Sequence, residues 1–89
     1  MTKGEQMMAD LGYEPDTRYD YGPDKRVYVK RELEEICCSD YYIITIENTQ
    51  DGKYVEKDLH TGYPATITQA FDFNELLACA EIVKEIKAQ

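Results

Sequence analysis

The strongest strand signal in the chain is the stretch Tyr41-Tyr42-Ile43-Ile44-Thr45-Ile46-Glu47. It is apolar at nearly every position, which is typical of a strand covered on both faces, so we expect it at the centre of a sheet. The residues that follow, Asn48-Thr49-Gln50-Asp51-Gly52, have hairpin chemistry, because an Asp-Gly pair tolerates the positive φ that such a turn needs. A partner strand is therefore predicted to return antiparallel over residues 53–59, nearer to an edge because its alternation is weak.

Two shorter segments are also predicted to join this sheet. The run Arg26-Val27-Tyr28-Val29-Lys30 is β-branched and aromatic, which predicts a strand over residues 26–30. Residues 65–68 are expected to add a brief fourth strand. Residues 32–38 carry apolar side chains at helical spacing, but the segment is too short to separate helix from strand. We expect a short helical or irregular connection there, with a strand as the open alternative.

Capping signals mark one helix near each end of the sequence. Thr2 and Glu5 have the spacing of a capping box, so a helix is predicted over residues 2–11, and Gly12 stands where a left-handed residue ends it. Asp72 and Glu75 form an acidic variant of the same box, which predicts a longer helix over residues 73–87.

The longer helix is predicted to be amphipathic. At 100° per residue, its apolar face gathers Phe73, Leu76, Cys79, Ala80, Ile82, Val83 and Ile86, and the opposite face gathers Asn74, Ala78, Glu81, Glu85 and Ala88. The elements fit one α+β domain over residues 1–89. We expect a three- or four-stranded antiparallel sheet, with the C-terminal amphipathic helix packed on one face and the short N-terminal helix beside it.

Net charge and apolar content exclude two classes of partner, nucleic acid and membrane, from our expectations. The 89 residues include 18 acidic and 10 basic side chains, for a net charge of −8, which opposes direct binding of nucleic acid. No apolar run approaches the length of a membrane span and the first residues lack the apolar block of a secretory signal, so no membrane partner and a cytoplasmic location are expected. The odd total of three cysteines, two of them adjacent, predicts reduced thiols.

The sequence contains no arrangement of residues that is typical of a catalytic or metal site. His60 is the single histidine and has no nucleophile at a motif spacing, so we expect a surface position rather than a general base. The adjacent Cys37 and Cys38 with a distant Cys79 do not give the spacing of a zinc site, and Cys79 falls on the apolar face of the helix. We therefore expect no catalytic residue, no metal and no cofactor. A small enzyme that depends on a cysteine or on His60 is the remote alternative.

Residues 14–24 have the most unusual local composition in the chain. The segment holds two prolines, one glycine, four acids and two of the eight tyrosines, which predicts a loop. Tyrosine gives a large contact area at low entropic cost, and an acidic field around it suits a basic protein surface. We take as candidate partner-binding residues Asp16, Tyr19, Asp20, Tyr21 and Asp24. The alternatives are that these rings fold onto the sheet and that the acidity serves solubility alone.

The order of signals resembles the small accessory proteins that prophages and conjugative elements of Gram-positive bacteria encode. The resemblance rests on Leu11-Gly12-Tyr13 after a short helix, Tyr28-Val29-Lys30, the isoleucine-rich strand, Val55-Glu56-Lys57, and Ile67-Thr68 ahead of the final helix. The sequence departs from that pattern in carrying Gln69-Ala70-Phe71-Asp72 before the helix and the Cys37-Cys38 pair.

This resemblance implies a function by binding. Members of that group with known activity include inhibitors of host defence such as anti-CRISPR proteins, and no residue role carries over from them. We expect a non-enzymatic accessory protein that binds another protein, in its sharpest form an acidic inhibitor of a host defence nuclease. The alternative from another class is a homodimeric structural module, whose long helix or edge strand pairs with itself.

Overall fold

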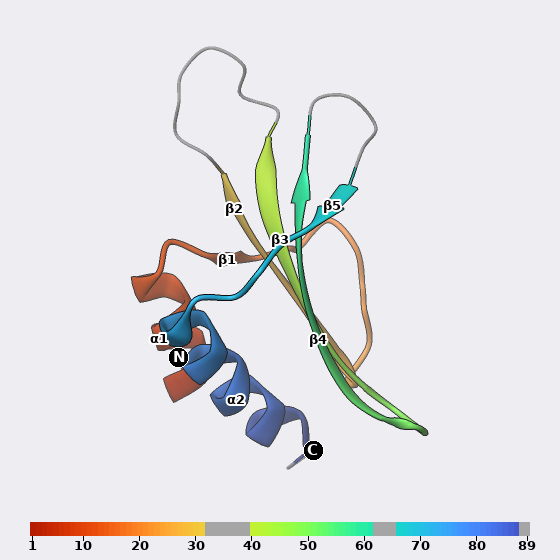
Figure 1. Ribbon diagram of the computed structural model, residues 1–89. Helices are drawn as coiled ribbons and strands as arrows, with labels where there is room; N and C mark the ends of the chain where they lie inside the picture. The colour runs from red at the N-terminus through yellow and green to blue at the C-terminus, as the bar shows by residue number, and fades with distance from the viewer. Residues whose placement is uncertain (32–39, 62–65, 88–89) are drawn as a thin grey trace.

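The computed structural model describes residues 1–31, 40–61 and 66–87, and it has the expected α+β architecture, with one antiparallel sheet and two helices (Figure 1). In chain order the elements are α1 (Lys3–Asp10), β1 (Glu14–Pro15), β2 (Lys25–Arg31), β3 (Tyr41–Thr49), β4 (Gly52–His60), β5 (Thr66–Thr68) and α2 (Phe73–Lys87). The strands lie side by side in the order β1-β2-β3-β4-β5, and each neighbouring pair is antiparallel. The sheet is therefore a meander that follows the order of the chain.

Strand β3 lies at the centre of the sheet, as its apolar composition predicted. It pairs with β2 from Lys25↔Glu47 to Arg31↔Tyr41 and with β4 from Tyr41↔His60 to Thr49↔Gly52. The hairpin turns at Gln50 and Asp51, and the next residue, Gly52, has a φ of 144°, which favours glycine. The pairing of Thr49 with Gly52 and of Tyr41 with His60 extends the ladder beyond the predicted limits of both strands, and the Thr49 hydroxyl also donates to the carbonyl of Gly52 at 3.0 Å.

The sheet has five strands among the described residues, rather than the three or four expected. The additional strand is β1, which lies in the segment predicted as loop. It pairs Glu14 with Val29 and Pro15 with Tyr28. Sequence pattern missed it because a two-residue strand has no periodicity, and Pro15 is tolerated there because an edge strand needs no amide on its outer side. The connection over residues 32–38, for which helix and strand were both open, lies outside the described residues.

Both helices begin with the predicted caps. At α1 the Glu5 amide donates to the Thr2 hydroxyl oxygen at 3.2 Å, and the Thr2 amide donates to the Glu5 carboxylate at 2.8 Å. At α2 the Glu75 amide donates to Asp72 Oδ1 at 2.8 Å, and the Asp72 amide donates to Glu75 Oε1 at 2.9 Å. Gly12 follows α1 with a φ of 92°. Two orphan amides are thus satisfied at each helix start.

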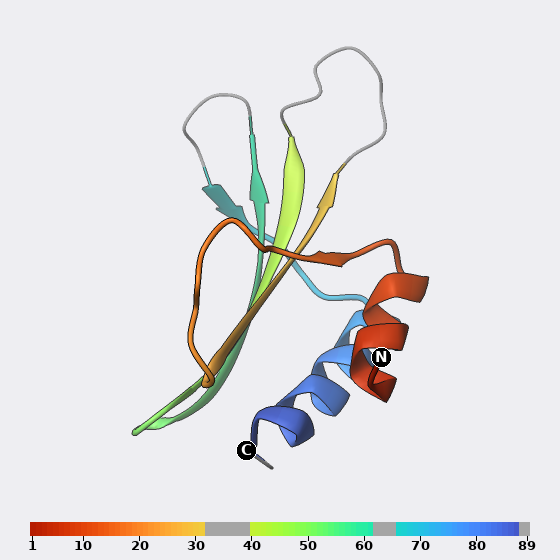
Figure 2. The ribbon, with the colours of Figure 1, turned by 180° about the vertical axis from the view of Figure 1, so that it is seen from behind.

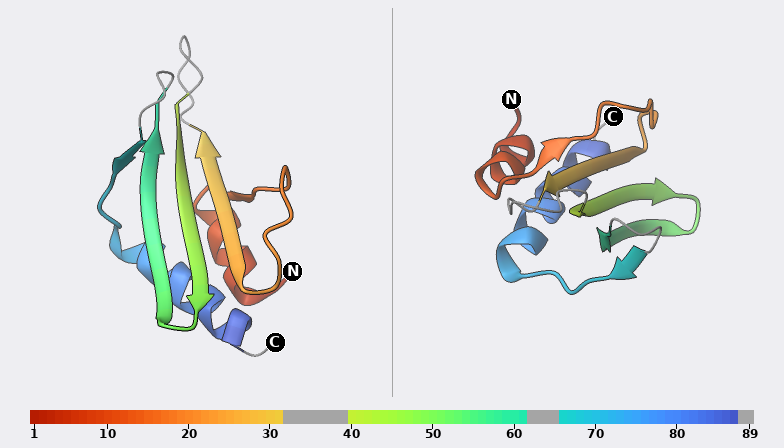
Figure 3. Two further views of the ribbon diagram at one scale, coloured as in Figure 1. Left: turned by 90° about the vertical axis from the view of Figure 1, so that its right-hand side faces the viewer. Right: turned by 90° about the horizontal axis from the view of Figure 1, so that it is seen from above.

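The helices pack together and cover one face of the sheet (Figure 3). The core between the two layers consists of Met8, Tyr13, Tyr28, Ile44, Ile46, Ala78, Cys79, Ile82 and Ile86. The ends of the two helices are joined through Glu85, whose carboxylate accepts from the Thr2 hydroxyl at 2.8 Å and from the Gly4 amide at 2.9 Å.

The buried side of α2 is rotated from the side that was predicted. Phe73 and Leu76 are 73% and 46% exposed, whereas Ala78 is fully buried. The reason is α1, which lies so close to α2 that a Cβ atom at Gly4 would stand 2.7 Å from Ile82 Cδ1. The small side chain of Ala78 suits this approach between helices. A hydrophobic period cannot reveal a second helix as a neighbour, so the prediction placed Ala78 on the solvent side and Ala80 on the core side, and Ala80 is exposed.

Candidate functional site

The candidate site is the segment 16–24, called here the acidic loop, which connects β1 to β2 (Figure 2). Its first half lies against the sheet face that points away from the helices. There it encloses a hollow of about 140 Å³, lined by Glu14, Pro15, Asp16, Thr17, Arg18, Val29 and Tyr41. The loop ends where the Asn48 amide donates to the Asp24 carbonyl at 2.8 Å, and this bond fixes the entry into β2 beside β3.

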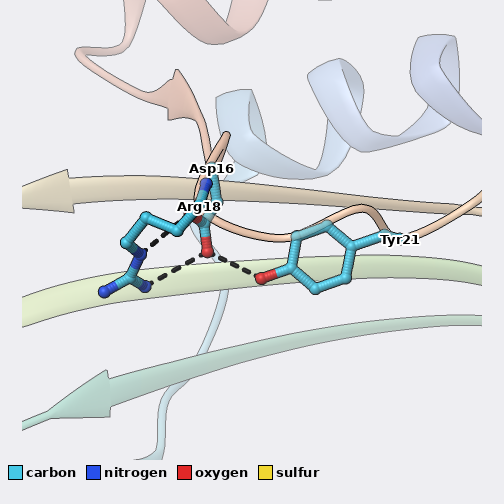
Figure 4. A network of polar contacts seen from close by, with 3 residues as sticks. All are labelled: Asp16, Arg18 and Tyr21. Atoms are coloured by element: carbon cyan, nitrogen blue, oxygen red, sulfur yellow. Dashed lines mark hydrogen bonds and ion pairs between the residues drawn. The ribbon is translucent and has the colours of Figure 1, made fainter.

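A polar network centred on Asp16 holds the acidic loop in shape (Figure 4). Arg18 Nε donates to Oδ1 at 3.0 Å and Arg18 Nη2 to Oδ2 at 3.1 Å, a two-pronged contact that also gives geometric specificity. The Tyr21 hydroxyl donates to Oδ2 at 2.7 Å, and the Asp16 side chain is only 3% exposed. Asp16 therefore acts as the internal anchor of the loop.

The ionisation of this network follows from its contacts. The hydrogen bonds from Arg18, and further bonding from the Tyr21 hydroxyl, hold the pKa of Asp16 well below its usual range. Burial and the hydrogen bond to Asp16 raise the pKa of Tyr21 to about 12. At neutral pH the loop anchor is therefore a charged carboxylate held by a cation and a protonated phenol.

The five predicted binding residues fall into two groups in the structure. Asp16 and Tyr21 are engaged inside the loop, as described above. Tyr19 is 65% exposed, and Asp20 and Asp24 are exposed. Asp20 shapes the turn as well, because its Oδ1 accepts from the Gly22 amide at 3.0 Å. The surface that a partner can reach therefore presents one aromatic ring and two acids.

Cations that sequence reasoning did not include interleave with these rings. The guanidinium of Arg18 lies 5.6 Å from the centroid of the Tyr19 ring and 5.9 Å from that of Tyr41. Lys25 Nζ lies 5.4 Å from the Tyr21 ring centroid, and the Tyr19 and Tyr21 rings meet edge to face at 6.0 Å. The position of Arg18 two residues after Asp16 is the signal from which this pairing could have been suspected. The loop thus combines the exposed acids Asp20 and Asp24 with cations that lie against its rings.

A second polar cluster, missed by sequence reasoning, lies under α2. The Glu75 carboxylate, in a residue only 3% exposed, accepts from the Tyr13 hydroxyl at 2.8 Å and from Lys57 Nζ at 2.8 Å. Burial alone raises the pKa of Glu75, but the bonds from Lys57, the Asp72 amide and Tyr13 outweigh it, and the net pKa lies below the usual value. Among the described residues no buried side-chain polar atom lacks a partner, so this cluster is a satisfied structural link.

The groups considered for catalysis are placed as follows. His60 ends β4, and its ring lies 4.8 Å from the ring of Tyr41. Cys79 is buried in the core, as its position on the helix predicted, and burial and the charge of Glu75 raise its pKa to about 12. Cys37 and Cys38 lie outside the described residues. Within residues 1–31, 40–61 and 66–87, no three His, Cys, Asp or Glu side chains are grouped as metal ligands.

A hollow of about 330 Å³ lies between α1, β1 and β2. It is lined by Met1, Glu5, Ala9, Tyr13, Pro15 and Tyr28. Its carboxylate, Glu5, is engaged in the cap of α1. Burial raises the pKa of Tyr28 to about 12 and that of Tyr13 still further, with the bond to Glu75 adding to the shift at Tyr13. These groups stay in one protonation state at neutral pH.

In the described part of the chain, no helix combines the length and the apolarity needed to cross a bilayer. Comparison of the chain with protein-family models, with curated proteins and with solved structures finds no match.

Proposed function

We propose that the protein is a non-enzymatic accessory protein of a mobile element and acts by binding a basic surface of another protein through exposed side chains of the acidic loop. The contact residues are Tyr19, Asp20 and Asp24. The observation that carries the proposal is a tyrosine 65% exposed on a loop whose shape the Asp16 network already sets. A preformed loop loses little conformational entropy when it binds, so the exposed ring can contribute most of its contact area to affinity.

Charge supports the choice of a basic partner. The net charge of −8 attracts a positive surface over several ångströms and raises the rate of encounter. The sharpest form of the proposal is an acidic inhibitor that occupies the basic nucleic-acid channel of a host defence nuclease. The resemblance to prophage accessory proteins, some of which are anti-CRISPR inhibitors, supports that form.

The test begins with affinity purification from the native host and continues with variants of the loop. Tyr19→Ala is expected to weaken binding to the recovered partner about 30-fold, the effect of a contact worth about 2 kcal/mol. Asp20→Lys and Asp24→Lys are expected to slow association and to reduce its salt dependence. Asp10→Lys is the matched control, because Asp10 is an exposed acid at the end of α1, on the helix side of the sheet. Equal affinity of all four variants would remove the loop from consideration.

The nuclease form has its own test. Purified effector is mixed with an excess of the protein, and DNA cleavage is measured. Inhibition that Asp20→Lys relieves is the expected result. Normal cleavage in the presence of excess protein would leave protein binding standing and exclude the nuclease as partner. The described surroundings of His60 and Cys79 give no support to the alternative of an enzyme, so we do not propose it.

A further inference from the structure

The hollow of about 330 Å³ between α1, β1 and β2 lies on the helix side of the sheet, whereas the acidic loop lies on the other face. At about 30 Å³ for each water-sized group, the hollow has room for about ten non-hydrogen atoms. Its volume falls at the lower end of the range of small-molecule sites in proteins, so it suits a small ligand. The chemistry of its walls determines which kind of ligand that is.

Tyr28 brings an unpartnered hydroxyl to this hollow. The residue is only 3% exposed, yet its hydroxyl forms no hydrogen bond within residues 1–31, 40–61 and 66–87. In that part of the chain every fully enclosed side-chain polar atom has a partner, so the hydroxyl of Tyr28 must touch open space. The hollow is the open space that Tyr28 lines. A nearly buried phenol without a partner in the fold is a hydrogen-bonding group that a ligand can use.

Glu5 contributes a carboxylate of which one oxygen is in use. Oε1 accepts from the Thr2 amide at 2.8 Å, whereas Oε2 accepts no hydrogen bond from the described residues. The hydrogen bond from Thr2 is the main reason why the pKa of Glu5 lies below its ordinary value, so the group is charged at neutral pH. Burial, and to a lesser degree the charge of Glu5, raise the pKa of Tyr28 to about 12. The two groups therefore lie within electrostatic range of each other.

The cations nearest to the hollow leave the charge of Glu5 unpaired. Arg26 and the amino group of Met1 act on Glu5 only over a distance, because none of the ion pairs between described residues includes Glu5. Lys30 lies over the Tyr13 ring, with Nζ 5.4 Å from the centroid, and does not line the hollow. An anionic ligand would therefore meet an unpaired carboxylate, whereas a cationic ligand would gain an ion pair.

The remaining walls suit an aromatic body. Tyr13, Pro15 and Tyr28 contribute rings, and Met1 contributes a polarisable thioether. Aromatic rings pack against one another in offset or edge-to-face arrangements, and a methionine sulfur also favours contact with a ring. The Tyr13 hydroxyl is already bonded to Glu75, so it adds no free polar group. The polar groups left for a ligand are thus one carboxylate oxygen and one phenol.

We propose that this hollow binds a small aromatic amine in its ammonium form. The ammonium group donates to Glu5 Oε2 and to the hydroxyl oxygen of Tyr28, and the aromatic body packs against Tyr13, Pro15 and Met1. A hydrogen bond between two charged groups is stronger than a neutral one, so the charge of the ligand determines its affinity. The site goes beyond the proposed function, because it lies on the opposite face of the sheet from the acidic loop.

Binding of phenethylammonium chloride to the full chain tests this site. An amide NMR titration at constant ionic strength is expected to give saturable shifts at Ala9, Tyr13 and Tyr28, with a Kd of about 1 mM for a ligand of this size. Phenethyl alcohol and hydrocinnamate are the matched probes, because they keep the aromatic body and replace the ammonium by a neutral or an anionic group. Each is expected to bind at least about tenfold more weakly.

Two conservative variants test the polar groups. Glu5→Gln removes the charge, and α1 keeps its start because glutamine also completes a capping box. This variant is expected to bind phenethylammonium about tenfold more weakly and phenethyl alcohol unchanged, a difference that a purely structural effect would not give. Tyr28→Phe removes a hydroxyl that bonds nothing in the fold and is expected to weaken phenethylammonium binding about fivefold. Asp10→Asn, on the same helix but outside the hollow, is the control and is expected to bind normally.

Three results would overturn the amine site. They are shifts that do not saturate by about 10 mM, equal affinity for phenethyl alcohol, and unchanged binding of phenethylammonium by Glu5→Gln. Acetyl-lysine amide presents the same ammonium group on the side chain of a peptide. Tighter binding of this probe than of phenethylammonium would overturn the aromatic body in favour of a lysine from another protein. Asp20→Lys in the acidic loop is expected to leave amine binding unchanged, so failure of the amine site is distinguishable from failure of the proposed function.

Discussion

The carboxylate of Glu75 is predicted to be the polar group on which the docking of α2 depends most. It joins three parts of the fold, because it accepts from Tyr13 after α1, from Lys57 on β4 and from the Asp72 amide at its own helix start. Glu75→Ala removes all these bonds at once. The Lys57 side chain, which is 12% exposed, then keeps its charge without a counterion.

The magnitude follows from this burial. Breaking a buried ion pair from one side costs about 3–5 kcal/mol, and we expect about 3 kcal/mol here because Lys57 keeps some contact with water. A domain of this size has a total stability of about 4–13 kcal/mol, so the variant loses a large part of it. With a urea dependence of about 1.5 kcal/mol per molar, the midpoint of unfolding is expected to fall by about 2 M.

The assay is urea unfolding followed by far-ultraviolet circular dichroism. Glu81→Ala is the control, since it breaks an exposed pair with Lys84 on the same helix, and it is expected to leave the midpoint unchanged. Glu75→Gln is expected to fall between the two, because the amide keeps the shape of the side chain and loses its charge. Equal midpoints for Glu75→Ala and Glu81→Ala would refute the reasoning.

The pH dependence of this effect has a definite sign. Burial alone raises the pKa of Glu75, but the hydrogen bonds that the carboxylate accepts lower the pKa by more than burial raises it. The pKa in the folded state therefore lies below the ordinary 4.5. A carboxyl group with a lowered folded pKa contributes stability that is present above its unfolded pKa and is lost as the pH falls through the folded value. The difference in stability between the parent and Glu75→Gln is therefore expected to shrink below about pH 4.5.

Three further outcomes are expected. Gly4→Ala destabilises the fold by about 1–2 kcal/mol in thermal unfolding, because overpacking against Ile82 exceeds the gain of about 1 kcal/mol in helix propensity; a stabilised variant would contradict the close contact. Cys79, as the single thiol of a variant whose other two cysteines are serine, reacts with a thiol reagent only at the rate of unfolding, and immediate reaction of the native protein would contradict its burial. In ultraviolet titration Tyr21 and Tyr28 are expected to ionise near pH 12, above the ordinary tyrosine pKa of 10.0. The stability that these raised pKa values contribute is fully present below pH 10 and is lost as the pH rises toward 12. Tyr28→Phe is expected to remove one of the ionisation steps near pH 12, and an unchanged absorbance there would contradict the assignment.

The parts of the fold that local chemistry determines could be predicted from the sequence. The apolar run of β3, the turn at Gln50 and Asp51 and the two capping boxes each depend on neighbours within a few residues. Strand β1 could not be predicted, because two residues have no period and their pairing with β2 is a tertiary contact. The buried side of α2 was placed wrongly at Phe73 and Ala78 for the same reason, since hydrophobicity does not show where α1 packs.

The sequence indicated where the candidate site lies but did not distinguish the roles of its residues. Composition singled out the acidic loop, yet it gave the same weight to Asp16, which is an internal anchor, and to Tyr19, which faces solvent. That difference depends on where the Arg18 side chain points, and spacing does not determine a rotamer. Glu75 was recognised only as a helix cap, because its distant partners Tyr13 and Lys57 are brought to it by the fold.

The contact between the start of α1 and the end of α2 has a consequence for biosynthesis. Thr2 and Gly4 are translated 83 and 81 residues before Glu85, their common acceptor. While the polypeptide is still being elongated, the amino-terminal helix has only its own cap and no second helix to lie against. Helix α1 can therefore reach its native place only after translation has passed residue 85, although it is made before every strand of the sheet.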